Sequence, residues 1–318
     1  MNMDSNLPHY IIILGTNYSG TSAVFDYFSG RRDLYDPLLG EEYQLPQLPN
    51  GLMSLEAAAG NAFNPSSVEF ALSKFEDIVN KLIRSKTFWR SGKGYGKKLQ
   101  SFEKSIKNFI DEICVVNFPM QLDWRRLMVS IPERLIIQFK QHLGLNNVMP
   151  QARLLVSKDE LIISAQKMHN DIFKKNSGGR PVLLDMSSAG WNPIESTKYF
   201  SNCKIVIVTR DPRDQFIELR QYKKANSVEG FVIWYREMQK YLNKFDDPTI
   251  LKVQFEEFVN QNEKIVNKFC KHTSLSSGVL SSYQPSLSKK NVGKYQNHLN
   301  KNERDIIEGQ LSEYCYDN

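Results

Sequence analysis

The feature that most constrains the fold is a buried strand that leads into a glycine-containing loop and then a helix. Residues 10–14 read Tyr-Ile-Ile-Ile-Leu, a continuous apolar run typical of a strand buried on both faces of a parallel sheet. After the loop, apolar residues recur at helical spacing up to Gly30, where we expect a left-handed glycine to end the helix. This order of elements favours an α/β fold.

The loop between them has the frame of a phosphate-binding loop. Gly15, four residues, Gly20 and then Thr21 reproduce G-x-x-x-x-G-K-[ST] with threonine in place of the lysine. Such a loop turns backbone amides toward an anion at a helix N-terminus, although a tight turn without a ligand is the alternative. Without the lysine, a nucleoside triphosphate is disfavoured. The residues predicted to hold the anion are Gly15, Thr16, Asn17, Tyr18, Ser19, Gly20, Thr21 and Ser22.

Three further apolar runs are predicted to be strands, at residues 181–185, 204–209 and 249–255. Helical patterns, such as those at 159–175 and 228–242, lie between them. Alternating strands and helices predict a P-loop-like, mainly parallel sheet flanked by helices.

We expect residues 1–318 to form a single domain. Within it, residues 52–178 are predicted to be a mostly helical insertion, in which no run reads clearly as a strand. We expect this insertion to lie over the carboxyl edge of the sheet, where ligands of such sheets bind, and to bind the acceptor.

A second charged segment directly follows a predicted strand. Residues 210–214 read Arg-Asp-Pro-Arg-Asp. An arginine fork suits a phosphate, and neighbouring aspartates can hold that fork in place. We therefore predict that Arg210 and Arg213 bind a phosphate, with a salt-bridge cluster at the end of the strand as the alternative.

Together these segments resemble the sulfotransferases that use 3′-phosphoadenosine 5′-phosphosulfate (PAPS). That family carries K-S-G-T-[ST] for the 5′-phosphosulfate and R-[ND]-P-[RK]-D for the 3′-phosphate; the matching residues here are 18–22 and 210–214. Residues 252–257 are similar to its strand ending in [YF]-E-[DE]. Residues 288–295 are similar to its late basic loop.

The resemblance covers residues 10–45 and 180–318 and is closest to bacterial members, for which we expect carbohydrate acceptors. It implies transfer of a sulfuryl group from PAPS to a hydroxyl of the acceptor. It also places Lys290, Gly293 and Lys294 of the late loop at the 3′-phosphate.

Two positions depart from the family pattern. Tyr18 stands where the family has the loop lysine, and it offers a hydrogen bond without charge. A cation from elsewhere is therefore expected, from Lys290, Lys294, Arg213 or the basic segment 84–107. Glu218 stands where the family has a serine that contacts the 3′-phosphate, and a carboxylate there would repel that group.

A general base is expected to accept the proton of the acceptor hydroxyl. Glu42 is our first candidate and Glu41 the second, because carbohydrate sulfotransferases of similar layout carry a glutamate near this position. Two surface glutamates in a turn are the alternative. Catalytic roles are thus predicted for Glu42, Glu41 and Tyr18.

Two other functions stay open. The chain can be a homologue that binds the nucleotide or a sulfated glycan without turnover, as the missing lysine suggests. It can instead be a P-loop kinase or nucleotidase, with Asp185 at a metal.

Composition limits the partners. A net charge of +6 suits an anionic ligand better than a nucleic acid, for which we predict no binding. No apolar run is long enough to span a membrane and no signal peptide is visible, so a cytoplasmic protein without membrane insertion is expected. The four cysteines lack metal-ligand spacing, and no metal is predicted.

Overall fold

The structure is a computed structural model in which the chain divides into two compact units. Residues 1–47 and 173–318 form the first unit, and residues 48–172 form the second. The residues that the structure describes are 9–59, 64–89, 91–119, 130–144, 151–188 and 190–316.

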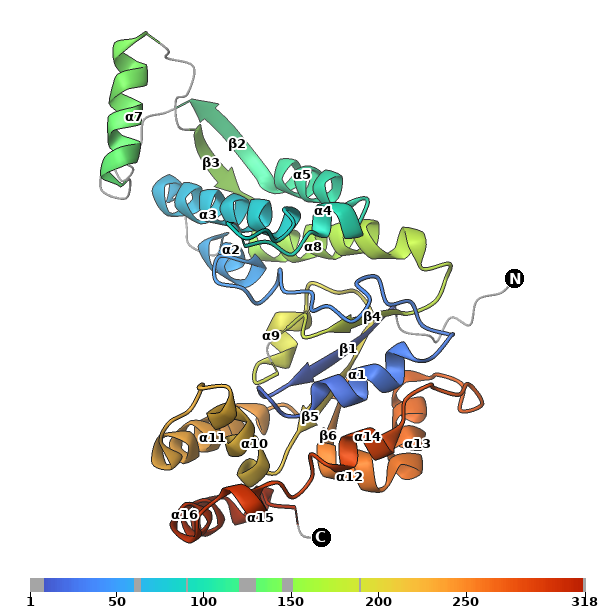
Figure 1. The fold of residues 1–318 in the computed structure, drawn as a ribbon. Helices are drawn as coiled ribbons and strands as arrows, with labels where there is room; N and C mark the ends of the chain where they lie inside the picture. Colours follow the sequence, from blue (N-terminus) through green and yellow to red (C-terminus); the bar gives the residue numbers. More distant parts are fainter. Residues whose placement is uncertain are drawn as a thin grey trace. The chain divides into compact units, whose positions relative to one another are not determined.

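A four-stranded parallel sheet forms the centre of the first unit (Figure 1). Its strands are, in spatial order, β4 (Val182–Asp185), β1 (Tyr10–Gly15), β5 (Cys203–Thr209) and β6 (Ile250–Gln254). All three neighbouring pairs run parallel. The predicted α/β fold with a mainly parallel sheet is confirmed, and these are the four strands that the sequence predicts.

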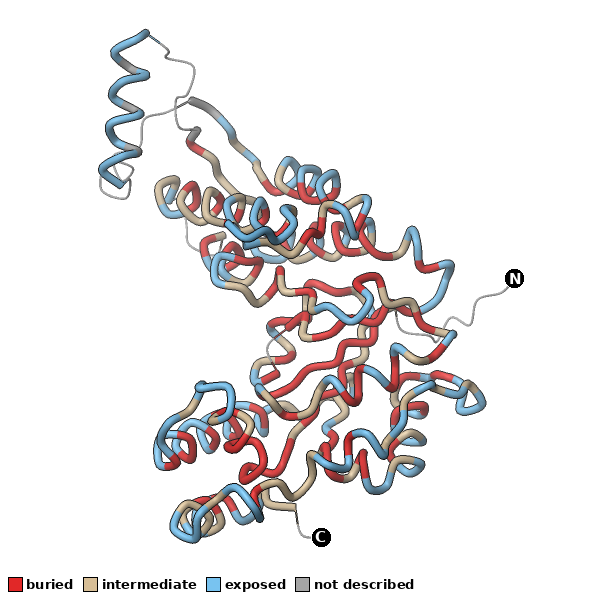
Figure 2. The backbone as a smooth tube through the Cα atoms, viewed as in Figure 1, coloured by how far each residue is buried: buried red, intermediate tan, exposed pale blue. Residues whose placement is uncertain are grey.

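One face of the sheet is covered by α1 (Thr21–Ser29), α12 (Phe255–Asn260) and α13 (Asn262–Thr273) (Figure 1). Side chains alternate along a strand, so Ile11 and Ile13 point to this face and pack with residues of these helices. Tyr10 is on the other face, with its ring 5.3 Å from that of Phe200. Burial on both faces explains why β1 is buried along its whole length (Figure 2).

A second group of helices in this unit packs around its own apolar core. Phe216 of α10, Phe231 of α11 and Ile307 of α16 are among its buried residues. The helices of the unit beyond α1, α12 and α13 are α9 (Pro193–Thr197), α10 (Pro212–Gln221), α11 (Val228–Leu242), α14 (Pro285–Lys289), α15 (Tyr295–His298) and α16 (Lys301–Leu311). Two 3-10 turns, Lys174–Asn176 and Ser312–Tyr314, complete it.

Gly30 does end α1, but the predicted left-handed conformation is wrong. Its φ is −70°, in the right-handed region. A glycine is needed here because the Ser281 side chain packs against it: a Cβ atom on Gly30 would lie 2.6 Å from the Ser281 hydroxyl. A contact with a segment 250 residues away is invisible to local sequence patterns.

The second unit is mostly helical. Its helices are α2 (Leu52–Ala59), α3 (Pro65–Ile83), α4 (Tyr95–Lys98), α5 (Phe102–Ile113), α7 (Ile131–His142) and α8 (Lys158–Phe173). Across the described residues of the whole chain, no helix combines the length and apolarity needed to cross a membrane.

The unit also contains two strands, where the sequence shows no run that reads clearly as a strand. β2 (Cys114–Pro119) and β3 (Gln151–Leu155) pair antiparallel. Arg153 of β3 forms ion pairs of 2.7 Å with Glu69 and Glu76 of α3. This short ribbon depends on tertiary contacts, so its strands carry only a weak local signal.

Candidate functional site

A cavity of about 770 Å³ lies at the carboxyl ends of the four parallel strands. Asn17 follows β1, Met186 follows β4, Arg210 follows β5 and Phe255 follows β6, and all four line the cavity. Ligands of open parallel sheets bind at this edge, and the volume is typical of small-molecule sites. The glycine loop and the segment that begins at Arg210, both singled out in the sequence, therefore line one cavity.

The two glycines of the loop leave no room for a side chain. A Cβ atom on Gly15 would lie 2.5 Å from the Ser19 hydroxyl, and one on Gly20 would lie 2.4 Å from the Phe255 ring. Gly20 also has a φ of +86°, which favours glycine. Gly190, which the sequence analysis missed, belongs to the same cluster, since a Cβ atom there would lie 2.2 Å from the Gly15 carbonyl oxygen.

Buried donors hold the carbonyl groups of the loop. Gln215 donates from Nε2 to the carbonyl oxygens of Thr16 and Asn17, at 2.5 Å each. The Ser19 hydroxyl accepts the Thr16 amide at 3.0 Å. Asn17 and Tyr18 both adopt positive φ, so the chain turns tightly here.

The loop leads directly into the first turn of α1, where Thr21 and Ser22 line the cavity. Amides in the first turn of a helix have no carbonyl partner within the helix and carry a partial positive charge. The arrangement can therefore bind an oxyanion at this point of the cavity.

The segment after β5 ties the glycine loop to the late loop of the chain. Arg210 donates to the Tyr18 carbonyl at 3.2 Å and to the Asn291 carbonyl at 2.6 Å. Asp214 accepts the amides of Gly293 at 2.6 Å and Tyr295 at 2.8 Å. The three segments are thus fixed to one another by side chains of residues 210–214.

Three of the predicted phosphate contacts, Arg213, Lys290 and Gly293, are not among the residues that line the cavity. Arg213 is buried in ion pairs with Asp211 at 2.6 Å and Glu308 at 2.7 Å, and its guanidinium lies over the Tyr295 ring. Lys290 is exposed and outside the cavity lining. Gly293 directs its amide to Asp214, as described above. The basic segment 84–107 belongs to the second unit.

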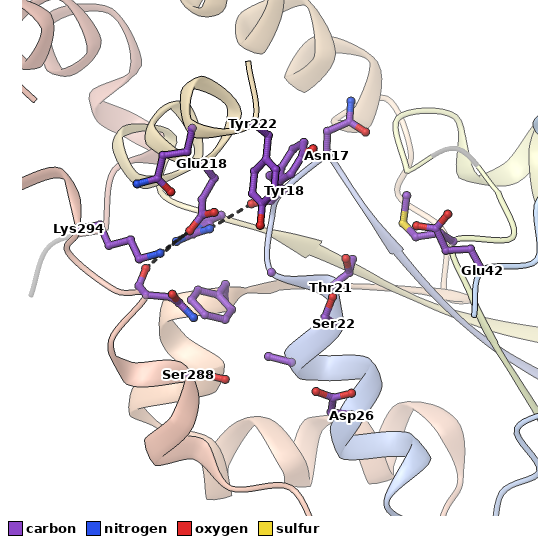
Figure 3. A pocket seen from close by; sticks show the side chains of 17 residues that line it. Asn17, Tyr18, Thr21, Ser22, Asp26, Glu42, Glu218, Tyr222, Ser288 and Lys294 are labelled. Atoms are coloured by element: carbon purple, nitrogen blue, oxygen red, sulfur yellow. Dashed lines mark hydrogen bonds and ion pairs between the residues drawn. The ribbon is translucent and has the colours of Figure 1, made fainter. Parts of the chain in front are cut away.

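Lys294 does line the cavity, where it is paired with a carboxylate. Its Nζ lies 2.6 Å from Glu218 Oε1, and Arg210 Nη2 lies 3.6 Å from the same oxygen (Figure 3). Next to this cluster the rings of Tyr18 and Tyr222 stack, with centroids 4.9 Å apart (Figure 3). One end of the cavity thus combines two cations, one carboxylate and an aromatic pair.

Glu42 lies at the other end of the cavity, beyond Thr21 and Ser22 (Figure 3). Gln44 Nε2 donates to its Oε2 at 2.5 Å, which orients the carboxylate. Glu41, its neighbour, is exposed and outside the lining. Of the two predicted bases, the structure brings only Glu42 to the glycine loop.

Asp185 is buried behind this end of the cavity. Burial, together with the negative charge of nearby Glu42, raises the pKa of Asp185 to about 7. Its Oδ1 atom has no hydrogen-bond partner among the described residues. The described part of the chain also contains no cluster of three His, Cys, Asp or Glu side chains able to hold a metal.

Gln215 and Tyr222 are not predicted above as site residues, although their spacing from Glu218 is a local signal in the sequence. Gln215 and Glu218 are three residues apart and share one face of α10, and Tyr222, four residues further on, is the C-cap residue directly after the helix. That helix begins directly after Arg210, and its face toward the cavity is predictable once Arg210 is assigned to the site.

No protein-family model matches the chain, and no curated protein sequence matches it significantly. Among solved structures, it is similar to the sulfotransferase domain of the Synechococcus PCC 7002 olefin synthase, with 13% identity, a TM-score of 0.44 and coverage of 100% of this chain and 98% of that one. It is also similar to the sulfotransferase domain from the curacin biosynthetic pathway, with 15% identity, a TM-score of 0.42 and coverage of 97% and 99%. A sulfotransferase from Alicyclobacillus acidocaldarius matches with 13% identity, a TM-score of 0.37 and coverage of 96% of both chains. The first two structures are sulfotransferase domains and the third is a sulfotransferase. At these levels of similarity, an assignment of function depends on the residues of the cavity.

Proposed function

We propose that the protein is a sulfotransferase that moves a sulfuryl group from a nucleoside 5′-phosphosulfate to a hydroxyl group. The observation that carries this proposal is the lysine-free glycine loop, which opens onto a cavity with Glu42 at one end. The motif resemblance names PAPS as the donor and a carbohydrate as the acceptor.

The proposed reaction is an in-line displacement at sulfur. The acceptor oxygen forms a bond to sulfur while the bond between sulfur and the bridging phosphate oxygen breaks. The nucleoside 5′-phosphate leaves with that electron pair, and the acceptor proton passes to the Glu42 carboxylate. Charge on the transferred group is spread over its oxygens, so positioning and electrostatic stabilisation supply most of the catalysis.

The residues of the loop have separate roles in this proposal. The first-turn amides of α1, with the hydroxyls of Thr21 and Ser22, bind the oxygens of the transferred and leaving groups. The Tyr18 hydroxyl offers a neutral hydrogen bond where the family has a lysine. Among the described residues that line the cavity, the cations are Lys294, which lies at the end away from Glu42 (Figure 3), and Arg210, which is 3.6 Å from Glu218 at that same end.

Binding without turnover is a second candidate function. It is favoured by one observation: the only lysine in the described lining, Lys294, is paired with Glu218 at 2.6 Å. A cavity without an available cation for the leaving group can bind a nucleotide and still fail to cleave it.

Substitution of Glu42 tests the proposal. Wild type, Glu42→Gln and the matched control Glu41→Gln would be incubated with PAPS or adenosine 5′-phosphosulfate and a panel of saccharides, with release of the nucleotide as the readout. We expect Glu42→Gln to lose about 10²–10⁴-fold in rate, as for loss of a general base, with nucleotide affinity retained. Glu41→Gln should stay close to wild type.

The alternatives give different results. Equal rates for Glu42→Gln and wild type would refute the assignment of the base. Nucleotide binding by wild type without turnover on any acceptor would favour the second candidate.

A further inference from the structure

The end of the cavity away from Glu42 contains a carboxylate where the motif resemblance implies a phosphate site. Glu218 lies between Lys294, at 2.6 Å, and Arg210, at 3.6 Å (Figure 3). Its side chain is 14% exposed and lines the cavity. The charge of both cations is therefore already opposed by a negative group of the protein itself.

Arg210 is committed to the fold as well as to this carboxylate. Nη1 donates to the Tyr18 carbonyl and Nη2 to the Asn291 carbonyl, and the side chain is only 4% exposed. Its guanidinium also lies over the Phe255 ring, with 5.2 Å to the centroid. These carbonyl contacts use two of the five N–H donors of the guanidinium, and its Nε has no hydrogen-bond partner among the described residues.

Glu218 is also held at the cavity by its helix. On the same face of α10, Gln215 is buried and bonded to the glycine loop, and Tyr222, the C-cap residue of the helix, stacks on Tyr18 of that loop. These contacts fix α10 against the loop on both sides of Glu218. The backbone of α10 therefore keeps the carboxylate at this end of the cavity.

The chemistry of the cluster favours a sugar hydroxyl over a phosphate. A carboxylate only accepts hydrogen bonds, and ribose hydroxyls are donors that carboxylates bind in other nucleotide-binding folds. A 3′-phosphate would instead meet a like charge at close range. We propose that Glu218 selects a nucleotide with a free 3′-hydroxyl, so that the donor is a nucleoside 5′-phosphosulfate without a 3′-phosphate. This inference rests on the proposed function and deepens it at the donor's 3′ position.

Calorimetric titration of the full chain tests the inference. The probes are adenosine 5′-phosphate and adenosine 3′,5′-bisphosphate, which share the 5′ group and differ at the 3′ position. We expect wild type to bind the monophosphate at least tenfold more tightly. Glu218→Ser and the size-matched Glu218→Gln should shift the ratio of the two affinities toward the bisphosphate by tenfold or more. The control Glu237→Ser removes an exposed glutamate of α11 and should leave the ratio unchanged.

The possible failures are distinguishable. If wild type binds the bisphosphate as tightly as the monophosphate or more tightly, the inference is wrong and the proposed function stands. A ratio that neither Glu218 variant moves, with both variants folded by circular dichroism, would also overturn it. If wild type binds neither nucleotide at millimolar concentration, the nucleotide site and the proposed function fall together.

Discussion

Replacing Asp185 with asparagine should stabilise the protein in a pH-dependent manner. Asp185 is buried at the end of β4, and its pKa is raised from 3.8 to about 7 by burial and then by neighbouring carboxylates. Because the folded protein holds this proton more tightly than the unfolded chain, the free energy of unfolding falls as pH rises from about 4 to about 7. Asparagine has a similar shape and no charge, so Asp185→Asn should remove this decrease in the free energy of unfolding.

The size of the effect follows from the difference between the two pKa values. One unit corresponds to about 1.4 kcal/mol, so the advantage of Asp185→Asn over wild type should grow by about 2.5 kcal/mol between pH 5 and pH 8. For a chain of this length, unfolding entropy of about 2.1 cal/mol/K per residue converts this into about 4 °C of melting temperature. Burial also raises the pKa of Glu256 to about 7. Glu256 therefore makes a similar contribution to the pH dependence of the free energy of unfolding, and this contribution remains in Asp185→Asn.

Thermal and urea unfolding of both proteins at pH 5 and pH 8 would measure this. Asp305→Asn, at an exposed position of α16, is the matched control and should show the same difference from wild type at both pH values. A variant that is destabilised equally at pH 5 and pH 8 would show that Asp185 is not a buried carboxyl with a raised pKa.

Two further predictions concern the glycine loop. Gly20→Ala should lower the free energy of unfolding by more than about 1–2 kcal/mol, because the strain of a left-handed alanine is added to a clash with Phe255. The control Gly40→Ala has the same φ of +86° and open space around it, so it should show the strain alone. Equal losses for the two variants in urea unfolding would exclude the clash. Gln215→Leu should cost about 2 kcal/mol, because two carbonyl groups of the loop lose their buried donor, and hydrogen exchange of residues 16–22 should accelerate. Unchanged exchange there would show that Gln215 does not hold the loop.

Much of the sheet and of the glycine loop is predictable because their signals are local. The run at residues 10–14 is apolar throughout, since β1 is covered on both faces. Gly15 is needed for a close approach to Ser19 and Thr21 within the loop itself, and Gly20 for its left-handed turn, so both are local needs that the glycine spacing indicates. Arg210 could be placed near them because strands of a parallel sheet end at the same edge.

Features that the sequence did not predict, such as the ion pairs of Arg213 and the β2–β3 ribbon, depend on residues that are distant in the sequence. Arg213 has the pattern of a phosphate ligand, but its charge is opposed by Asp211 and by Glu308, which lies 95 residues away. β2 and β3 pair across a long connection, and neither strand is long enough to be recognised alone. Motif spacing shows which residue types are present and leaves open which of them are already paired.

The two departures from the family pattern change the charge of the cavity in the same direction. Tyr18 removes a positive charge beside the anion-binding loop, and Glu218 adds a negative charge between Arg210 and Lys294. With either change alone, the cavity would still suit a highly charged nucleotide, although one contact to that nucleotide would be weaker. Together they lower the positive charge of the cavity at the glycine loop and beside Lys294, and the stacked rings of Tyr18 and Tyr222 lie next to Glu218. A ligand with fewer phosphate groups therefore suits this cavity better, and stacking can recover part of the affinity that the lost charge would have supplied.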